Sequence, residues 1–341
     1  MHKLGTILLL IILTGSLMAC AGAETKPDEQ SGQSDSLALL RKACMDPDSE
    51  NSVAACRKVL KMQPNDPKME HCLGWQLCLD GKLPEGIAHL RKSCKLQPEG
   101  DLIHYHLGVA LEKRGDRSGA VAAFKKSIKL DPKHTESYVA AGILLRKMGK
   151  KPEAEKMLRQ AIKSDPKSAT ALAQLSLTLA QLGKLAEAIE TGKKAVELKP
   201  DNVNARSNLG LFMTNAGQAA EAIEQLSKAV EIDPQNATAQ YNLGLAYTKT
   251  DALEEAARAY FNAILTREDF PQAQHNLAVI LIGLGLCKES KSHLDRSHEL
   301  GVKSAPIVLE QYKKICEPAP EGEGEGEAEG EDPASKSPES S

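Results

Sequence analysis

Small, apolar and proline residues repeat every thirty-four positions through the middle of the chain. Small residues at fixed helical spacing let two helices pack closely, and large neighbours on the same face fill the core. The pattern therefore predicts a helical hairpin as the repeating unit. The first small column is Gly74, Gly108, Gly142, Ser176, Gly210 and Gly244; the second is Gly86, Ala120, Ala154, Ala188, Ala222 and Ala256; and the leucines beside the first are Leu73, Leu107, Leu175, Leu209, Leu243 and Leu277.

Two further columns predict where the helices end. Glycine supplies the left-handed conformation that commonly follows the last turn of a helix, and proline stops a helix that precedes it. The glycines follow the expected first helix, and the prolines follow the expected second helix. The glycines are Gly81, Gly115, Gly149, Gly183 and Gly217, and the prolines are Pro64, Pro98, Pro132, Pro166, Pro200 and Pro234.

The period divides the chain into units. A degenerate hairpin is expected over residues 37–66, with helices near 37–45 and 51–62. A polar-faced capping helix is expected over 305–316, because the last repeat of an array must present a polar surface to water. Between them we expect seven full units, over 67–100, 101–134, 135–168, 169–202, 203–236, 237–270 and 271–304.

The pattern resembles the tetratricopeptide repeat, a helical hairpin of thirty-four residues. Leu107-Gly108, Ala120, Phe124 and Pro132 match its motif, as do Leu243-Gly244, Tyr247, Ala256 and Tyr260. The resemblance implies an all-α fold, a right-handed superhelical solenoid whose concave face binds other proteins. Three departures are local: Gly192 replaces a large core residue, Asp251 replaces a turn glycine, and the seventh unit has Ala278 and Ser290 in its small columns. We expect the unit that holds Gly192 to be the softest point of the array.

The first helices line the concave face in this family. An apolar stripe lies one residue beyond the first small column, and it indicates either a partner-binding groove or side chains buried between adjacent first helices. Asparagines two residues before the small column resemble a ladder that holds a peptide backbone, although asparagine is also common there in consensus repeats. The stripe is Trp75, Val109, Ile143, Leu177, Leu211, Leu245 and Val279, its neighbours include Tyr105, Tyr241 and His275, and the ladder is Gln174, Asn208, Asn242 and Asn276.

The N-terminus carries a targeting signal. Residues 4–17 are almost entirely apolar and are followed by Met18-Ala19-Cys20. The stretch is short for a membrane span, and its end resembles the lipobox of bacterial lipoproteins. The resemblance implies a signal peptide over 1–19, lipidation of Cys20 and a linker over 20–36, whereas an ordinary cleaved signal or an uncleaved anchor are the alternatives. Because Ala21 follows Cys20, we expect an outer-membrane protein that faces the periplasm and meets the membrane through its lipid anchor only.

Composition and charge narrow the class of protein. Aromatic residues are only 3% of the chain, which argues against a large β-sandwich or barrel. The net charge of −3 offers no basic excess for nucleic acid. The charge is uneven, because the tail over 317–341 carries nine acidic residues and one lysine. We expect the tail to be disordered, as a solubilising spacer or as an acidic ligand for a basic partner or calcium.

No motif for catalysis, cofactor binding or small-molecule chemistry occurs in the sequence. His104 and His106 are two residues apart on an expected helix, so they point to different faces and do not form a chelating pair. One repeat gathers several possible ligands without short metal-binding spacing, and packing or disulfide formation are the alternatives there. These residues are His71, Cys72, Cys78, His89 and Cys94.

Seven cysteines follow Cys20, in a chain expected to enter an oxidising compartment. The second helix of one hairpin runs antiparallel to the first helix of the next. This arrangement predicts a disulfide between Cys287 and Cys316, and another between Cys56 and Cys72. Buried free thiols are the alternative, and the odd number leaves at least one cysteine without a partner.

The sequence predicts a non-catalytic, membrane-tethered scaffold that binds a peptide or a partner helix. A sharper hypothesis is an assembly factor for pili or secretins, because lipoproteins of that kind combine a lipobox with such repeats. Alternatives are an accessory subunit of a cell-envelope enzyme complex and a structural periplasmic spacer.

Overall fold

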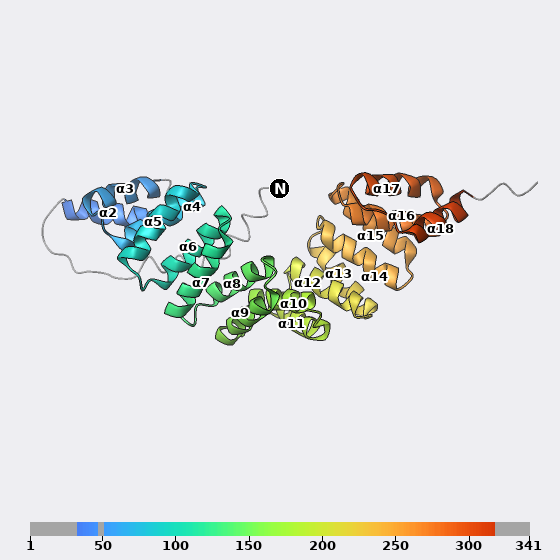
Figure 1. Cartoon of the computed structure of the whole chain (residues 1–341), viewed down its shortest axis with the longest axis horizontal. Coiled ribbons are helices and arrows are strands. Elements are labelled where there is room, and N and C mark those ends of the chain that lie inside the picture. Colours follow the sequence, from blue (N-terminus) through green and yellow to red (C-terminus); the bar gives the residue numbers. More distant parts are fainter. Residues whose placement is uncertain (1–32, 47–50, 318–341) are drawn as a thin grey trace, which may run out of the picture. The chain divides into compact units, whose positions relative to one another are not determined.

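The computed structural model describes residues 33–46 and 51–317, and this part of the chain holds seventeen α-helices and no strand (Figure 1). The expected signal peptide, Cys20 and the acidic tail lie outside the described residues, apart from Glu317. The first described helix begins at Gln33, inside the expected linker. No helix within the described ranges is long and apolar enough to span a membrane.

The chain divides into two compact units after Pro234. In each unit, consecutive helices pair as antiparallel hairpins, and each hairpin packs against the next. The N-terminal unit contains α2 (Gln33–Met45), α3 (Ser52–Met62), α4 (Pro67–Leu79), α5 (Leu83–Leu96), α6 (Asp101–Arg114), α7 (Arg117–Leu130), α8 (Thr135–Lys147), α9 (Lys151–Ser164), α10 (Ala169–Gln181), α11 (Leu185–Leu198), α12 (Val203–Asn215) and α13 (Ala219–Ile232). The C-terminal unit contains α14 (Ala237–Lys249), α15 (Leu253–Thr266), α16 (Pro271–Gly283), α17 (Cys287–Glu299) and α18 (Pro306–Cys316).

Most hairpins close through a small residue on the first helix and a large one on the second. Gly244 on α14 shows the reason most clearly, because a Cβ atom there would lie 2.6 Å from Tyr260 Cδ1 on α15. Tyr260 is almost completely buried. The glycine therefore lets the aromatic ring approach the first helix closely, which removes the ring from water.

The turns between the two helices of a hairpin confirm the role of the glycine column. Gly81, Gly115, Gly149, Gly183 and Gly217 all have φ between 77° and 90°. Asp251 takes the corresponding place in its hairpin with φ 59°, the one non-glycine with positive φ among the described residues. An L-residue in this conformation is strained by roughly 1–2 kcal/mol, and aspartate tolerates it better than most.

The hairpin of α10 and α11 reverses the small-and-large arrangement. Ser176 replaces the usual glycine of the first helix, and Gly192 replaces the large residue of the second. The Ser176 hydroxyl donates to the Ala188 carbonyl over 2.6 Å, and a Cβ on Gly192 would lie 2.9 Å from the same hydroxyl oxygen. Ser176 and Leu209 thus occupy the space into which a side chain at Gly192 would project.

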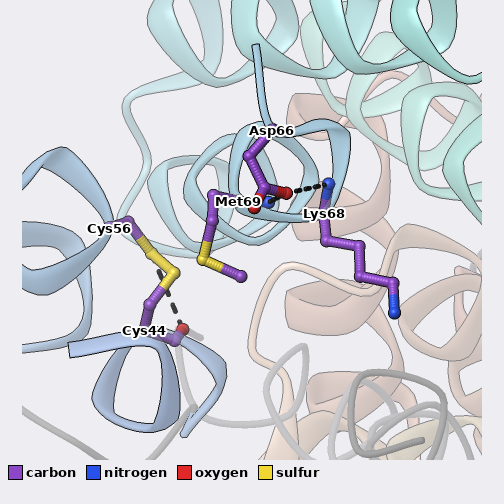
Figure 2. Close-up of a disulfide and its surroundings, with 5 residues drawn as sticks. All are labelled: Cys44, Cys56, Asp66, Lys68 and Met69. Atoms are coloured by element: carbon purple, nitrogen blue, oxygen red, sulfur yellow. Dashed lines mark hydrogen bonds between the residues drawn. A yellow bond between two sulfur atoms is a disulfide. The ribbon is translucent and has the colours of Figure 1, made fainter. Parts of the chain in front are cut away.

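The disulfide expected between Cys56 and Cys72 is wrong. Cys56 on α3 is bonded to Cys44 on α2, and their Cα atoms are 4.8 Å apart (Figure 2). Cys44 and Cys56 face each other within one hairpin, so the pairing is local rather than across the junction to α4. Cys72 belongs to the same buried core as the disulfide, together with Met69, which Figure 2 shows beside it.

The second disulfide joins Cys287 on α17 to Cys316 on α18, the pair expected from antiparallel packing, with Cα atoms 5.3 Å apart. Helix α18 packs through Val308 and Tyr312 against the core of α16 and α17. The exposed surface of α18, where a polar-faced cap is expected, is mixed: Glu310, Gln311, Lys313 and Lys314 are exposed, and so are Ile307, Leu309 and Ile315. A single short helix with this many apolar residues cannot turn all of them toward one neighbour.

Candidate functional site

The first helices of the N-terminal unit form one face, because α4, α6, α8, α10 and α12 each contact the next in the series. We call it the first-helix face. One stripe residue on each of these helices is half-buried: Trp75, Val109, Ile143, Leu177 and Leu211.

The stripe residues pack against the cores of the hairpins and are also partly exposed. Val109 packs against the core built around α6 and α7, and Ile143 packs against a core that contains Val139 and Ala171. Each side chain nevertheless keeps some accessible surface. An apolar residue that recurs at the same place on successive helices offers a partner a row of contacts at regular spacing.

The row begins at a buried cluster of aromatic and imidazole rings. Trp75 on α4 stacks on His106 of α6, with ring centroids 4.0 Å apart and planes 8° from parallel. His71 Nε2 and His106 Nδ1 are hydrogen bonded over 2.7 Å. His106 Nε2 is buried and has no hydrogen-bond partner among the described residues. The imidazole pair therefore fixes the orientation of Trp75 from below the first-helix face.

Burial keeps both imidazoles neutral. Loss of hydration lowers the pKa of His71 from 6.5 to about 4. The pKa of His106 falls well below 6.5, first because of burial and then because His71 and His134 lie nearby. The sequence interpretation missed this pair, although its signal is visible: the two histidines are thirty-five residues apart, one repeat plus one position.

Tyr105 does not line the groove that the sequence predicted. Its side chain is only 4% exposed, because it packs against Phe124 of α7 and against His134 at the start of α8. Burial raises the pKa of Tyr105 to about 12. The residue supports the junction between two hairpins rather than a ligand.

The amide ladder is also interrupted. Asn242 is only 3% exposed, so a peptide on the surface cannot reach its amide. Gln174 accepts a hydrogen bond from Arg146 Nη2 over 3.0 Å, and Asn276 donates to the Tyr241 hydroxyl over 3.3 Å. Asn208 is half-buried on α12. The structure does not present these four side chains as one uniform row of peptide-backbone ligands.

The C-terminal unit carries its own short segment of the stripe. Leu245 and Tyr241 pack partly against the core that contains Tyr260 and Phe270, and Val279 packs partly against the core that contains Val308. His275 is half-buried on α16, with its Nδ1 3.4 Å from the Ser304 hydroxyl. Each of these side chains combines packing with partial exposure.

Glu70, His89, Cys94 and His104 make structural contacts. Glu70 is buried and accepts from His89 Nδ1 and Lys92 Nζ, each over 2.5 Å. Cys94 lies beside His104, with Sγ and Nδ1 3.7 Å apart, and burial raises the pKa of the Cys94 thiol to about 11, which leaves it protonated. Within the described residues, no group of three or more His, Cys, Asp or Glu side chains is placed to hold a metal ion.

Four family models identify tetratricopeptide repeats in the chain. Two models described as "Tetratricopeptide repeat" match residues 139–203 and 179–230, a third so described matches 102–134, and one described as "TPR repeat" matches 213–251. These residues lie in the hairpins from α6 to α14. Residues 102–134 and 139–251 are therefore tetratricopeptide repeats, and the fold defines a class of helical repeat proteins that generally serve as non-catalytic scaffolds for protein–protein interaction.

Solved structures of other proteins resemble parts of the chain. YrrB, a repeat protein with an unusual peptide-binding site, is 25% identical over 55% of this chain and 96% of its own, with a TM-score of 0.47. Cut9 with Hcn1 from the APC/C is 18% identical over 84% of this chain and 57% of its own, with a TM-score of 0.58. Pseudomonas aeruginosa pilF is 17% identical over 64% of this chain and 98% of its own, with a TM-score of 0.55.

The last two likenesses extend to the helical repeat fold alone, given their low sequence identity. No curated protein matches the chain.

Proposed function

We propose that the protein is a membrane-tethered scaffold that binds an extended peptide segment or a helix of a partner protein on its first-helix face. The observation that carries this proposal is the half-buried apolar residue at the same place on five successive first helices. Tetratricopeptide repeats in general bind protein or peptide partners, and this row supplies the apolar contacts that such a partner needs. The proposed role involves no catalysis.

The tether is the lipid proposed on Cys20, after removal of residues 1–19. The two disulfides support an oxidising compartment, since such bonds are rare in proteins of the cytosol. We place the protein in the bacterial cell envelope, at the outer membrane and facing the periplasm.

Within the envelope, an assembly factor for pili or secretins is the sharper candidate, on the combination of a lipobox with helical repeats. An accessory subunit of an envelope enzyme complex and a periplasmic spacer are the alternatives. The identity of the crosslinked partner separates these three roles.

Site-specific photocrosslinking in cells tests the proposal. A photoreactive amino acid replaces Leu211 in the stripe or, as a matched control, Leu198, an exposed leucine on the second helix α11. We expect a discrete crosslinked protein from the Leu211 position in the membrane fraction and none from the Leu198 position. With Cys20→Ser, the chain should leave the membrane fraction.

Secretin or pilin subunits in the crosslink would support the assembly role, and an envelope enzyme would support the accessory role. Equal crosslinking from both positions would contradict a binding function for the first-helix face. Absence of any crosslink would favour the spacer.

A further inference from the structure

The second helices of the N-terminal unit carry a repeated set of cations on their outer surface. In the first four hairpins, the same three positions of the second helix hold lysine or arginine, with Gln160 as the exception. We call the set the basic ladder: Arg57, Lys58 and Lys61 on α3; Arg91, Lys92 and Lys95 on α5; Lys125, Lys126 and Lys129 on α7; and Arg159 and Lys163 on α9. All of these residues are exposed except Lys126, which is half-buried.

Ion pairs show that neighbouring second helices present these residues on a shared surface. Arg57 on α3 pairs with Glu85 on α5 over 2.5 Å, and Arg159 on α9 pairs with Glu187 on α11 over 2.6 Å. Side chains on adjacent second helices therefore reach one another across the outside of the unit. The ladder lies on the second helices, whereas the first-helix face is formed by the first helices.

Little negative charge compensates the ladder. Helices α3 and α7 contain no acidic residue. In the described part of the chain, only Arg57, Lys92 and Arg159 of the ladder form ion pairs. Eight exposed or half-exposed cations remain without a carboxylate partner there, and such a surface attracts an anionic one.

The equivalent positions on later second helices hold fewer unpaired cations. Lys193 and Lys194 continue the basic ladder on α11, but Glu197 follows them, and both lysines form ion pairs. On α15 the corresponding places hold Phe261 and Leu265. The cations are thus concentrated on the helices nearest in sequence to the proposed lipid on Cys20.

Exposed apolar side chains accompany the cations at the ends of two of these helices. Met62 follows Lys61 at the end of α3 and is 50% exposed, and Leu96 follows Lys95 at the end of α5 and is 38% exposed. Cations beside exposed apolar groups suit the boundary between lipid headgroups and acyl chains. A soluble polyanion would use the charges but leave these two side chains in water.

We infer that the basic ladder lies against an anionic phospholipid surface. The inference rests on the proposed tether, because a lipid on Cys20 would hold α3, which begins thirty-two residues later, close to a bilayer. It revises the expectation that the membrane is met through the lipid anchor only. Each cation near such a surface favours binding by about fivefold, and tethering makes the second contact intramolecular.

Hydrogen exchange on vesicles tests the inference with the full chain. Vesicles of phosphatidylglycerol with phosphatidylcholine are compared with vesicles of phosphatidylcholine alone, and exchange is followed for every helix. The ladder variant carries Lys61→Gln, Lys95→Gln, Lys129→Gln and Lys163→Gln. The control variant carries Lys228→Gln, Lys249→Gln, Lys288→Gln and Lys303→Gln, which remove the same charge from exposed positions outside the ladder.

We expect phosphatidylglycerol to slow exchange in α3, α5 and α7 severalfold in the parent and control chains, and not in the ladder variant. High salt should abolish the effect, because the attraction is electrostatic. Unchanged circular dichroism of both variants establishes that they are folded.

Equal protection on both kinds of vesicle would overturn the inference, as would no protection in chains that float with the vesicles. Protection by a soluble peptide of residues 318–341 in place of vesicles would assign the ladder to the acidic tail instead. If the chain binds anionic vesicles through the basic ladder but does not bind neutral vesicles, the result supports the role of the ladder and contradicts the proposed lipid on Cys20.

Discussion

His71 and His106 show how one pair of side chains makes the fold sensitive to acid. Both imidazoles are buried, and their mutual hydrogen bond requires at least one neutral ring nitrogen as acceptor. The unfolded chain takes up a proton near pH 6.5, whereas folded His71 resists it down to about pH 4. The contribution of these two neutral histidines to the stability of the fold is therefore fully present above about pH 6.5, and it falls as the pH is lowered toward 4.

The pH dependence of local stability tests this pair. Protection of α4 and α6 against hydrogen exchange should weaken between pH 6.5 and 4, with about 3 kcal/mol attributable to His71. The double variant His71→Phe and His106→Phe should lose much of this dependence. His298→Gln, at an exposed histidine, serves as control and should retain it. An unchanged profile in the double variant would contradict the assignment.

A second residue-level prediction concerns the contact of Gly244 with Tyr260. Gly244→Ala would bring a methyl group within 2.6 Å of the ring, so we expect a loss of roughly 1–3 kcal/mol in the stability of the α14–α15 hairpin. Gly283→Ala is the matched control. The methyl group that it adds would have nothing within 4 Å, so this variant should be neutral or stabilising by up to about 1 kcal/mol. Thermal unfolding of both variants measures the difference, and equal losses would contradict the packing argument.

At the scale of an element, the structure of the α10–α11 hairpin alters the expected effect of Gly192 on local stability. A missing large side chain alone predicts a soft hairpin, but Ser176 and Leu209 border the place where that side chain would lie. The serine gains a short hydrogen bond to Ala188 in exchange for apolar contact. The softness expected at this hairpin stays a prediction, and hydrogen exchange compared across all hairpins measures it.

A double-mutant cycle tests the exchanged pair. Gly192→Leu alone should destabilise by roughly 1–3 kcal/mol because the new side chain meets the Ser176 hydroxyl, and Ser176→Gly alone should lose its hydrogen bond. The double variant recreates the arrangement of Gly142 with Leu158, so we expect a favourable coupling of about 1 kcal/mol or more. As a control, Ser127→Gly lies in another hairpin, so its effect on stability should add to that of Gly192→Leu. Additive effects of Gly192→Leu and Ser176→Gly would contradict a direct interaction between these two positions.

At the scale of the whole molecule, the hairpins could be predicted from sequence because the repeat fixes which residues share a column. A shared column of the repeat does not specify which side chains lie next to each other in a given hairpin. Cys56 faces both its own hairpin and the next one, so periodicity could not choose between Cys44 and Cys72. Asn208 and Asn242 share a column, yet Asn242 is buried and Asn208 keeps some exposure. The charge totals likewise concealed the basic ladder, because each repeat contributes only two or three cations.

The two disulfides lie in the first hairpin of the N-terminal unit and at the last helix of the C-terminal unit. In a repeat array the end repeats have one neighbour fewer, so fraying starts there. A crosslink that removes about 3 kcal/mol of loop entropy from the opened state lowers its population by about a hundredfold. In a reducing compartment both ends would open more often, and proteases would find them. The lifetime of this protein is therefore coupled to the redox state of its surroundings.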